Sequence, residues 1–146
     1  MAKLLGIATH VKKRGKLERL LTTSVTLEKG VADDFRGKPG SRQVTVLSRE
    51  GWLAACEAAG VELDWTERRA NLLIEGLDLQ ESAGQLLGIG DVRLLITKET
   101  DPCERMEEAY AGLYEAMLPE WRGGVCCRVV RAGQINVGDR VGLFNE

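Results

Sequence analysis

The chain has 146 residues, a net charge of −2 and a sequence pI near 5.6. We expect residues 1–146 to form a single domain, because a chain of this length buries enough surface to fold without a disulfide or metal staple. The acidic balance argues against nucleic-acid or anionic-membrane partners, and without a signal segment or a run of about 20 apolar residues we expect a soluble, cytoplasmic protein.

Short apolar and β-branched segments dominate the pattern, with two helices among them. Ser48 is predicted to cap a helix at residues 49–59 that Gly60 ends. Met106, Tyr110, Leu113 and Met117 form an apolar stripe, which predicts one helix that packs on the core and ends at Pro119. Strands are predicted at residues 4–11, 21–27, 43–47, 71–75, 92–97, 125–131 and 140–144.

Two similar turns suggest how these strands are joined. Gly90-Asp91 and Gly138-Asp139 each lie between apolar segments, as in a β-hairpin. Residues 28–42 form a long charged loop, which is either functional or a solvated connector. The predicted fold class is therefore mostly β with about two helices (α+β), as a partly closed sheet with helices at its ends.

The four cysteines show no Cys-x-x-Cys spacing, and His10 is the single histidine. That excludes an ordinary Cys/His zinc site, and in a reducing compartment the cysteines should be free thiols. Cys56 is expected in the core. Cys126 and Cys127 are neighbours in a predicted strand, so one should point inward and the other outward.

Cys103 is the residue best suited to chemistry. Asp101 is predicted to cap a helix, with Pro102 first, Cys103 second and Glu104 three residues after the cap. A helix start favours a thiolate, which can ligate a soft metal or carry sulfur. Carboxylates crowd the same turns and oppose ionisation, so a buried, purely apolar Cys103 stays open as the alternative.

Arg68 and Arg69 precede the predicted strand at residues 71–75. Guanidinium groups bind phosphate oxygens in a bidentate manner, so this pair could clamp a phosphate. The alternative is an ordinary charged surface. Composition alone leaves both interpretations open.

Six segments in this order resemble the MOSC domain, the module found at the C-terminus of molybdenum-cofactor sulfurases. The resemblance spans nearly the whole chain and implies a small stand-alone bacterial member with a β-barrel of short mixed strands. The matching segments are residues 30–37 (GVADDFRG), 42–44 (RQV), 69–72 (RANL) with 75–79 (EGLDL), 88–91 (GIGD), 101–103 (DPC) and 128–133 (RVVRAG) with 137–139 (VGD).

The resemblance implies binding of the molybdenum cofactor in its molybdopterin form. Cys103 would be the molybdenum ligand or a sulfur carrier, which suits a soft thiolate. Arg42, Arg68, Arg69 and Asn71 would contact the cofactor phosphate. Asp34 would be a polar contact or a turn residue. We therefore expect Cys103, Arg42, Arg68 and Asn71 to converge on one concave site reached by solvent.

This chain also departs from the family pattern. Relatives often have a histidine in the long loop, whereas residues 33–36 here read DDFR. Cys126 and Cys127 stand where relatives commonly have a tyrosine or a small residue. A second thiol near the site is therefore an open alternative to two ordinary strand residues.

Three functions fit this picture. The chain is predicted to carry or transfer sulfur in cofactor maturation, from a sulfur-donor protein toward a recipient molybdoenzyme. Alternatively, Cys103 permanently ligates molybdenum in a reductase of N-hydroxylated bases, supplied by an electron-transfer protein. In the third, the chain is a non-catalytic carrier of the pterin cofactor.

Overall fold

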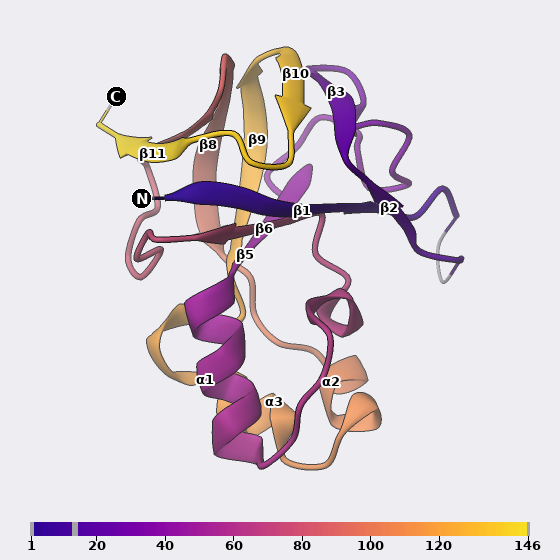
Figure 1. The fold of residues 1–146 in the computed structure, drawn as a ribbon, viewed down its shortest axis with the longest axis vertical. Coiled ribbons are helices and arrows are strands. Elements are labelled where there is room, and N and C mark those ends of the chain that lie inside the picture. Colours follow the sequence, from indigo (N-terminus) through magenta and orange to yellow (C-terminus); the bar gives the residue numbers. More distant parts are fainter. Residues whose placement is uncertain (1, 13–14, 146) are drawn as a thin grey trace.

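A computed structural model describes residues 2–12 and 15–145; Met1, Lys13, Arg14 and Glu146, which the predicted domain includes, lie outside the described residues. The strands occupy one half of the molecule and the helices the other (Figure 1). The strands are β1 (Lys3–Thr9), β2 (Glu18–Leu20), β3 (Thr22–Thr26), β4 (Gly30–Val31), β5 (Val44–Ser48), β6 (Leu72–Glu75), β7 (Leu86–Ile89), β8 (Val92–Glu99), β9 (Val125–Arg131), β10 (Gly133–Asn136) and β11 (Val141–Phe144). The helices are α1 (Arg49–Ala59), α2 (Glu104–Ala109) and α3 (Leu113–Met117), with 3-10 helices η1 (Trp65–Arg68) and η2 (Pro119–Trp121).

The strands form two sheets. Eight of them pair in the order β11-β7-β8-β9-β5-β6-β1-β2, and three in the order β10-β3-β4. Within the described strands, β5 and β6 are the parallel pair, which α1 connects, and the other pairs are antiparallel. The predicted mostly β fold with a few helices is confirmed.

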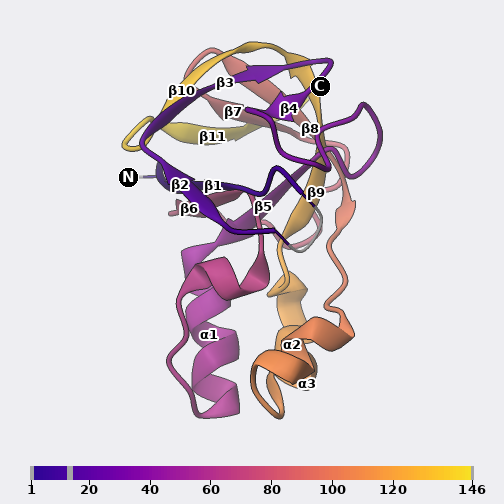
Figure 2. The ribbon, with the colours of Figure 1, turned by 90° about the vertical axis from the view of Figure 1, so that its right-hand side faces the viewer.

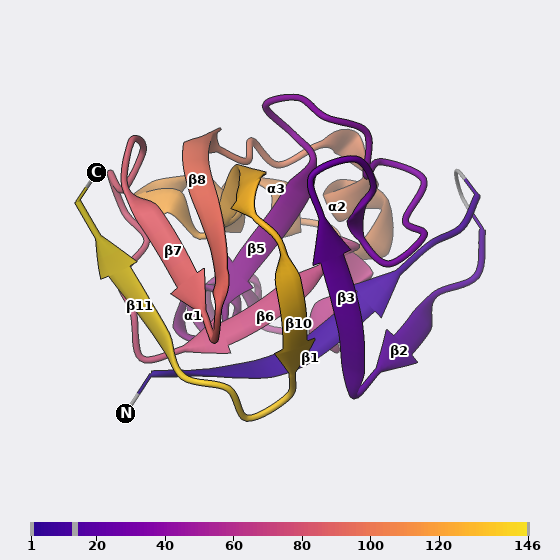
Figure 3. The same cartoon turned by 90° about the horizontal axis from the view of Figure 1, so that it is seen from above.

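The expected barrel is not closed among the described residues. The larger sheet keeps edge strands at β11 and β2, and the second sheet lies across it (Figure 3). The start of β1 does approach the corner between β10 and β11, where Leu4 N–H donates to the Asp139 carbonyl at 2.8 Å. This hydrogen bond joins β1 to the turn between β10 and β11. It does not extend into continuous pairing between strands.

Two apolar cores stabilise this arrangement. Side chains of both sheets fill the first, including Leu4, Val46 and Ile135, all fully or almost fully buried. The second, which includes Trp52 and Met117, belongs to the half of the molecule where the helices lie below the larger sheet (Figure 2). In the described part of the chain, no helix is both long and apolar enough to cross a membrane.

Local signals predicted α1 correctly. The Ser48 hydroxyl accepts a hydrogen bond from Gly51 N–H at 3.0 Å, and Gly60 ends the helix in the left-handed conformation with φ of 75°. The predicted second helix is instead two short ones, because Tyr110 is extended after α2 and Gly112 has φ of 93° before α3. Met106, Leu113 and Met117 are buried as expected, whereas Tyr110 is exposed.

The two similar turns have different outcomes. Gly90 and Asp91 do join β7 and β8 in an antiparallel hairpin. The hairpin predicted at Gly138-Asp139 is wrong, because β10 pairs with β3 whereas β11 pairs with β7. The second turn therefore carries the chain from one sheet to the other.

The cysteines are free thiols, and Cys56 is buried as predicted. The expectation that one of Cys126 and Cys127 faces outward is wrong, because both are fully buried. Strand β9 is covered on both faces at residues 125–127. Cys127 belongs to the core between the sheets, while the Cys126 sulfur lies 3.2 Å from the Thr100 hydroxyl.

Candidate functional site

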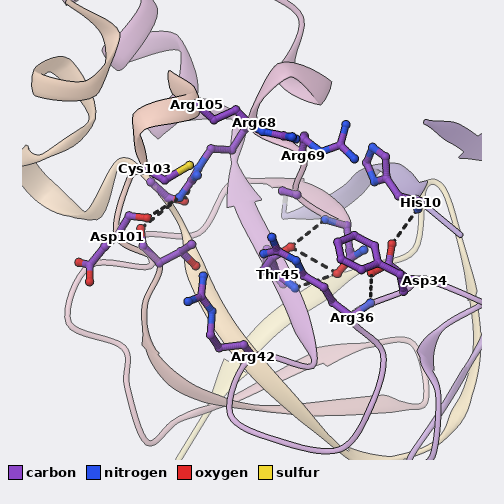
Figure 4. Close-up of a pocket in the computed structure, with 16 residues that line it drawn as sticks. His10, Asp34, Arg36, Arg42, Thr45, Arg68, Arg69, Asp101, Cys103 and Arg105 are labelled. Atoms are coloured by element: carbon purple, nitrogen blue, oxygen red, sulfur yellow. Dashed lines mark hydrogen bonds between the residues drawn. The ribbon is translucent and has the colours of Figure 1, made fainter. Parts of the chain in front are cut away.

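A cavity lies where the ends of several strands meet the loops that lead to η1 and α2 (Figure 4). Its walls come from the end of β1, the β4–β5 loop, β5, the η1–β6 segment, the β8–α2 loop and the turn before β9. The lining residues are His10, Asp34, Phe35, Arg36, Arg42, Thr45, Val46, Arg68, Arg69, Ala70, Asn71, Thr100, Asp101, Cys103, Arg105 and Gly123. The structure thus brings all six of the predicted site residues to one cavity.

Cys103 lies at this cavity with its side chain exposed. The prediction that it occupies the second position of a helix is wrong. Helix α2 begins at Glu104, and Cys103 precedes it with extended backbone angles of φ −122° and ψ 170°. Asp101 therefore does not cap this helix, and α2 has only six residues. What presents the thiol is an extended loop.

Arg68 explains why this loop stays extended. Its side chain is almost completely buried, with Nε donating to the Gly123 carbonyl at 3.2 Å. Its Nη2 donates to the carbonyls of Thr100 and Asp101, at 3.2 and 3.3 Å. The guanidinium thus holds the carbonyls of the two residues that precede Pro102 and Cys103. Burial lowers the pKa of Arg68, whereas the nearby thiol of Cys103 raises it.

Gly123 completes this brace. A Cβ added at Gly123 would lie 2.5 Å from the Thr100 carbonyl oxygen and 3.2 Å from Arg68 Nη2. The backbone of the turn must therefore lie against the guanidinium without a side chain between them. Arg68 is therefore mainly a positioning residue for the loop that carries Cys103.

Asn71 and Asp34 are likewise held by the fold. The Asn71 amide oxygen accepts from Thr45 N–H at 3.0 Å, and its Nδ2 donates to the Ala8 carbonyl at 3.2 Å. This side chain ties β1 and β5 together at the floor of the cavity. Asp34 accepts from the backbone N–H groups of His10 and Arg36, at 2.8 and 3.1 Å, which makes it a structural turn residue.

The cavity is strongly cationic although the chain is acidic overall. Five arginines line it against two aspartates, and one of those is Asp34 with its two backbone hydrogen bonds. Arg42 is exposed and Arg105 half-buried, and neither side chain makes a hydrogen bond or ion pair within the described residues. Arg69 donates from Nη2 to the Gly15 carbonyl at 3.4 Å. The walls therefore favour an anionic ligand.

Three basic residues of this cavity were not predicted from the sequence. His10, Arg36 and Arg105 come from the end of β1, the β4–β5 loop and helix α2. The His10 side chain is only 2% exposed, and its Nε2 has no hydrogen-bond partner. One signal was available, because His10 is the single histidine of the chain and lies near the end of the strand predicted at residues 4–11.

The second thiol considered from the sequence does not reach this cavity. Neither Cys126 nor Cys127 is among the lining residues. Cys126 lies behind the wall, close enough to Arg68 to raise the pKa of its guanidinium. Burial raises the pKa of Cys127 far above that of a free thiol, so this residue stays protonated in the core.

Comparison with known proteins gives a family and a fold. A family model described as the MOSC domain matches residues 25–142. A search of curated proteins found no match.

Solved structures also match. The YuaD protein of Bacillus subtilis is similar over 100% of this chain and 97% of its own, with a TM-score of 0.84 and 19% identity. YiiM of Geobacillus stearothermophilus covers 98% of this chain with 75% of its own, at a TM-score of 0.74 and 15% identity. YiiM of Escherichia coli covers 99% with 70% of its own, at a TM-score of 0.71 and 16% identity.

Proposed function

Because the chain belongs to the MOSC domain family, we propose that it binds the molybdenum cofactor in this cavity and carries sulfur on Cys103 during cofactor maturation. MOSC domains are associated with this cofactor in general. The observation that carries the proposal is an exposed thiol at a cavity lined by five arginines. A molybdopterin ligand needs both a soft donor and cationic partners for its phosphate.

The residues present fit such a ligand. Cys103 would face the metal or sulfur centre, Arg69 would meet the phosphate, and Arg42 would add positive charge to the cavity. Arg68 and Asn71 support this site mainly by holding its walls, since their polar groups bind backbone atoms. When bound, the cofactor supplies a thiophilic redox metal. The protein supplies orientation, positive charge and an exposed thiol.

Sulfur loading requires only the side chain of Cys103. Its thiolate attacks the terminal sulfur of a donor persulfide, the S–S bond of the donor breaks, and the donor thiolate leaves. Cys103 is then a persulfide, and no electrons are gained or lost overall. The exposed position of Cys103 beside the Arg68 guanidinium suits this exchange, because a donor can reach it and positive charge lies near the sulfur (Figure 4).

The test is to purify the protein from a molybdenum-replete host and measure molybdenum, molybdopterin and cyanide-labile sulfur per chain. Wild-type protein is expected to bind molybdopterin and to gain labile sulfur from a small-molecule persulfide. Cys103→Ala should lose the labile sulfur. Cys56→Ala is the matched control and should keep it, because Cys56 is buried in the helical core.

The other outcomes separate the alternatives. Molybdenum that disappears in Cys103→Ala, without labile sulfur in the wild type, would replace the carrier function by a permanent metal ligand, as a reductase requires. Molybdopterin bound equally by both proteins, again without labile sulfur, would leave a non-catalytic cofactor carrier. A chain that binds no molybdopterin would overturn the proposal.

A further inference from the structure

The side chain of His10 lies in the wall of the cavity with an unused polar atom. Its backbone is fixed on both sides, because N–H donates to Asp34 Oδ1 at 2.8 Å and the carbonyl accepts from Phe35 N–H at 2.7 Å. The side chain is 2% exposed and its Nε2 is buried without a partner. The fold therefore holds this imidazole at the cavity without satisfying it.

An unpaired buried polar atom costs free energy, roughly 1–3 kcal/mol for an ordinary group. Such atoms are rare in folded proteins and are often explained by a ligand or a catalytic role. Within the described structure, Nε2 is the single buried side-chain nitrogen or oxygen that lacks a hydrogen bond. It is also at the cavity that contains Cys103. A ligand that enters this cavity would give Nε2 its missing partner.

The charges around His10 indicate what kind of ligand atom that is. Burial lowers the pKa of His10, and the guanidinium groups of Arg69, Arg105 and Arg36 lower it further, against the opposing charge of Asp34. His10 and Arg69 lie beside each other at one end of the cavity, whereas Cys103 lies at the other (Figure 4). An imidazole among several arginines is suited to an anionic oxygen. Arg42, Arg68 and Asp101 are the remaining charged lining residues.

We propose that His10 is a ligand-binding residue: its Nε2 hydrogen-bonds an oxygen of a tetrahedral oxyanion, and the ring takes up a proton from solvent when that anion binds. Arg36, Arg69 and Arg105 neutralise the same anion. The inference rests on the proposed function, in which this anion is the cofactor phosphate and Cys103 meets the opposite end of the ligand. The affinity of the cavity for the anion then rises as the pH falls.

The single histidine makes this directly measurable, because ring-labelled protein gives one set of imidazole resonances. Sulfate is the probe, since it stays a dianion throughout the range in which histidine titrates. Saturating sulfate is expected to shift the imidazole resonances and to raise the pKa of His10 by at least about one unit. Sulfate affinity should then rise by at least roughly tenfold between a pH above and a pH below the two pKa values.

Variants separate this role from a structural one. His10→Gln keeps a polar side chain but cannot titrate, so it should bind sulfate with no histidine-dependent rise in affinity at low pH. Arg131→Gln, an exposed arginine outside the cavity, should behave as the wild type does. Imidazole signals that do not move at saturating sulfate would overturn the inference. A His10→Gln protein whose sulfate affinity rises at low pH as much as that of the wild type would also overturn it.

Two further arms identify the source of the anion. Ribose 5-phosphate that binds more tightly than molybdate indicates a phosphate carried on an organic ligand, and the reverse order indicates a free metal oxyanion. The outcome is independent of the sulfur measurement on Cys103. If His10 responds to sulfate but the chain carries no labile sulfur or molybdopterin, the anion site is supported and the proposed function fails. If the chain carries both but His10 does not respond to sulfate, the function is supported and this role of His10 fails.

Discussion

The two sides of the cavity use their polar side chains differently. On one side, which we call the braced wall, Asp34, Arg68 and Asn71 are buried and hydrogen-bonded to the backbone. On the other, the open side, are the side chains of Cys103, Arg42 and Arg105 and the Nε2 of His10, which make no hydrogen bond within the described residues. The braced wall is complete without a ligand, so it can position the open side in advance.

This difference separates positioning from binding. A substitution in the braced wall should act mainly on stability, because it leaves buried backbone groups without partners. A substitution on the open side should act mainly on ligand binding, because no side-chain hydrogen bond within the protein is lost.

The largest effect is expected for Arg68→Met. The substitution leaves the buried carbonyls of Thr100 and Gly123 without their donor, so the free energy of unfolding should fall by roughly 3 kcal/mol. Urea denaturation measures this change. Arg42→Met is the matched control and should change stability by less than about 0.5 kcal/mol, since Arg42 is exposed. Equal losses in both proteins would show that the two sides do not differ.

An intermediate effect is expected for His10 as the pH falls. Burial, reinforced by three arginines, lowers the pKa of His10 in the folded state, so below about pH 6.5 the unfolded chain binds the proton first. The free energy of unfolding should therefore fall with pH in this window and level off below the folded pKa. Denaturation of wild type and His10→Gln at about pH 7.5 and 5.5 measures it.

In that comparison, the fall in stability should be smaller for His10→Gln. Burial raises the pKa of Glu99, which works in the opposite direction, but this contribution is common to both proteins and cancels in their difference. Parallel pH profiles for the two proteins would mean that the ring of His10 is not held neutral by the fold. His10 would then belong with the satisfied groups of the braced wall.

The sequence predicted what local patterns control. Ser48 and Gly60 bound helix α1 as expected, because a cap and a left-handed stop act within one turn of chain. It failed where distant contacts decide. Cys103 lies before its helix because Arg68, more than thirty positions away, holds the preceding carbonyls. The Gly138-Asp139 turn has the local sequence of a hairpin, yet its two strands join different sheets.

The candidate site shows the same division. Motifs in the β4–β5 loop, before β6 and at Pro102-Cys103 led to residues that the structure brings to one cavity. They did not show that Arg68 and Asn71 bind backbone atoms, because those partners come from other elements. His10 was missed for a related reason. Its importance lies in an empty hydrogen-bond position and three arginines, which become neighbours only in the folded chain.

The smallest effect is expected for Arg42→Gln. Its guanidinium is exposed at the cavity, so water and salt screen its attraction for an anion, and the loss of sulfate affinity should be about 1 kcal/mol or less. Titration calorimetry at low and high sodium chloride measures it, and the loss should shrink as salt rises. Stability should stay that of the wild type. A loss of sulfate affinity that does not depend on salt, or a destabilised protein, would show that Arg42 belongs to the braced wall. Arg42 would then be a positioning residue and not a binding residue.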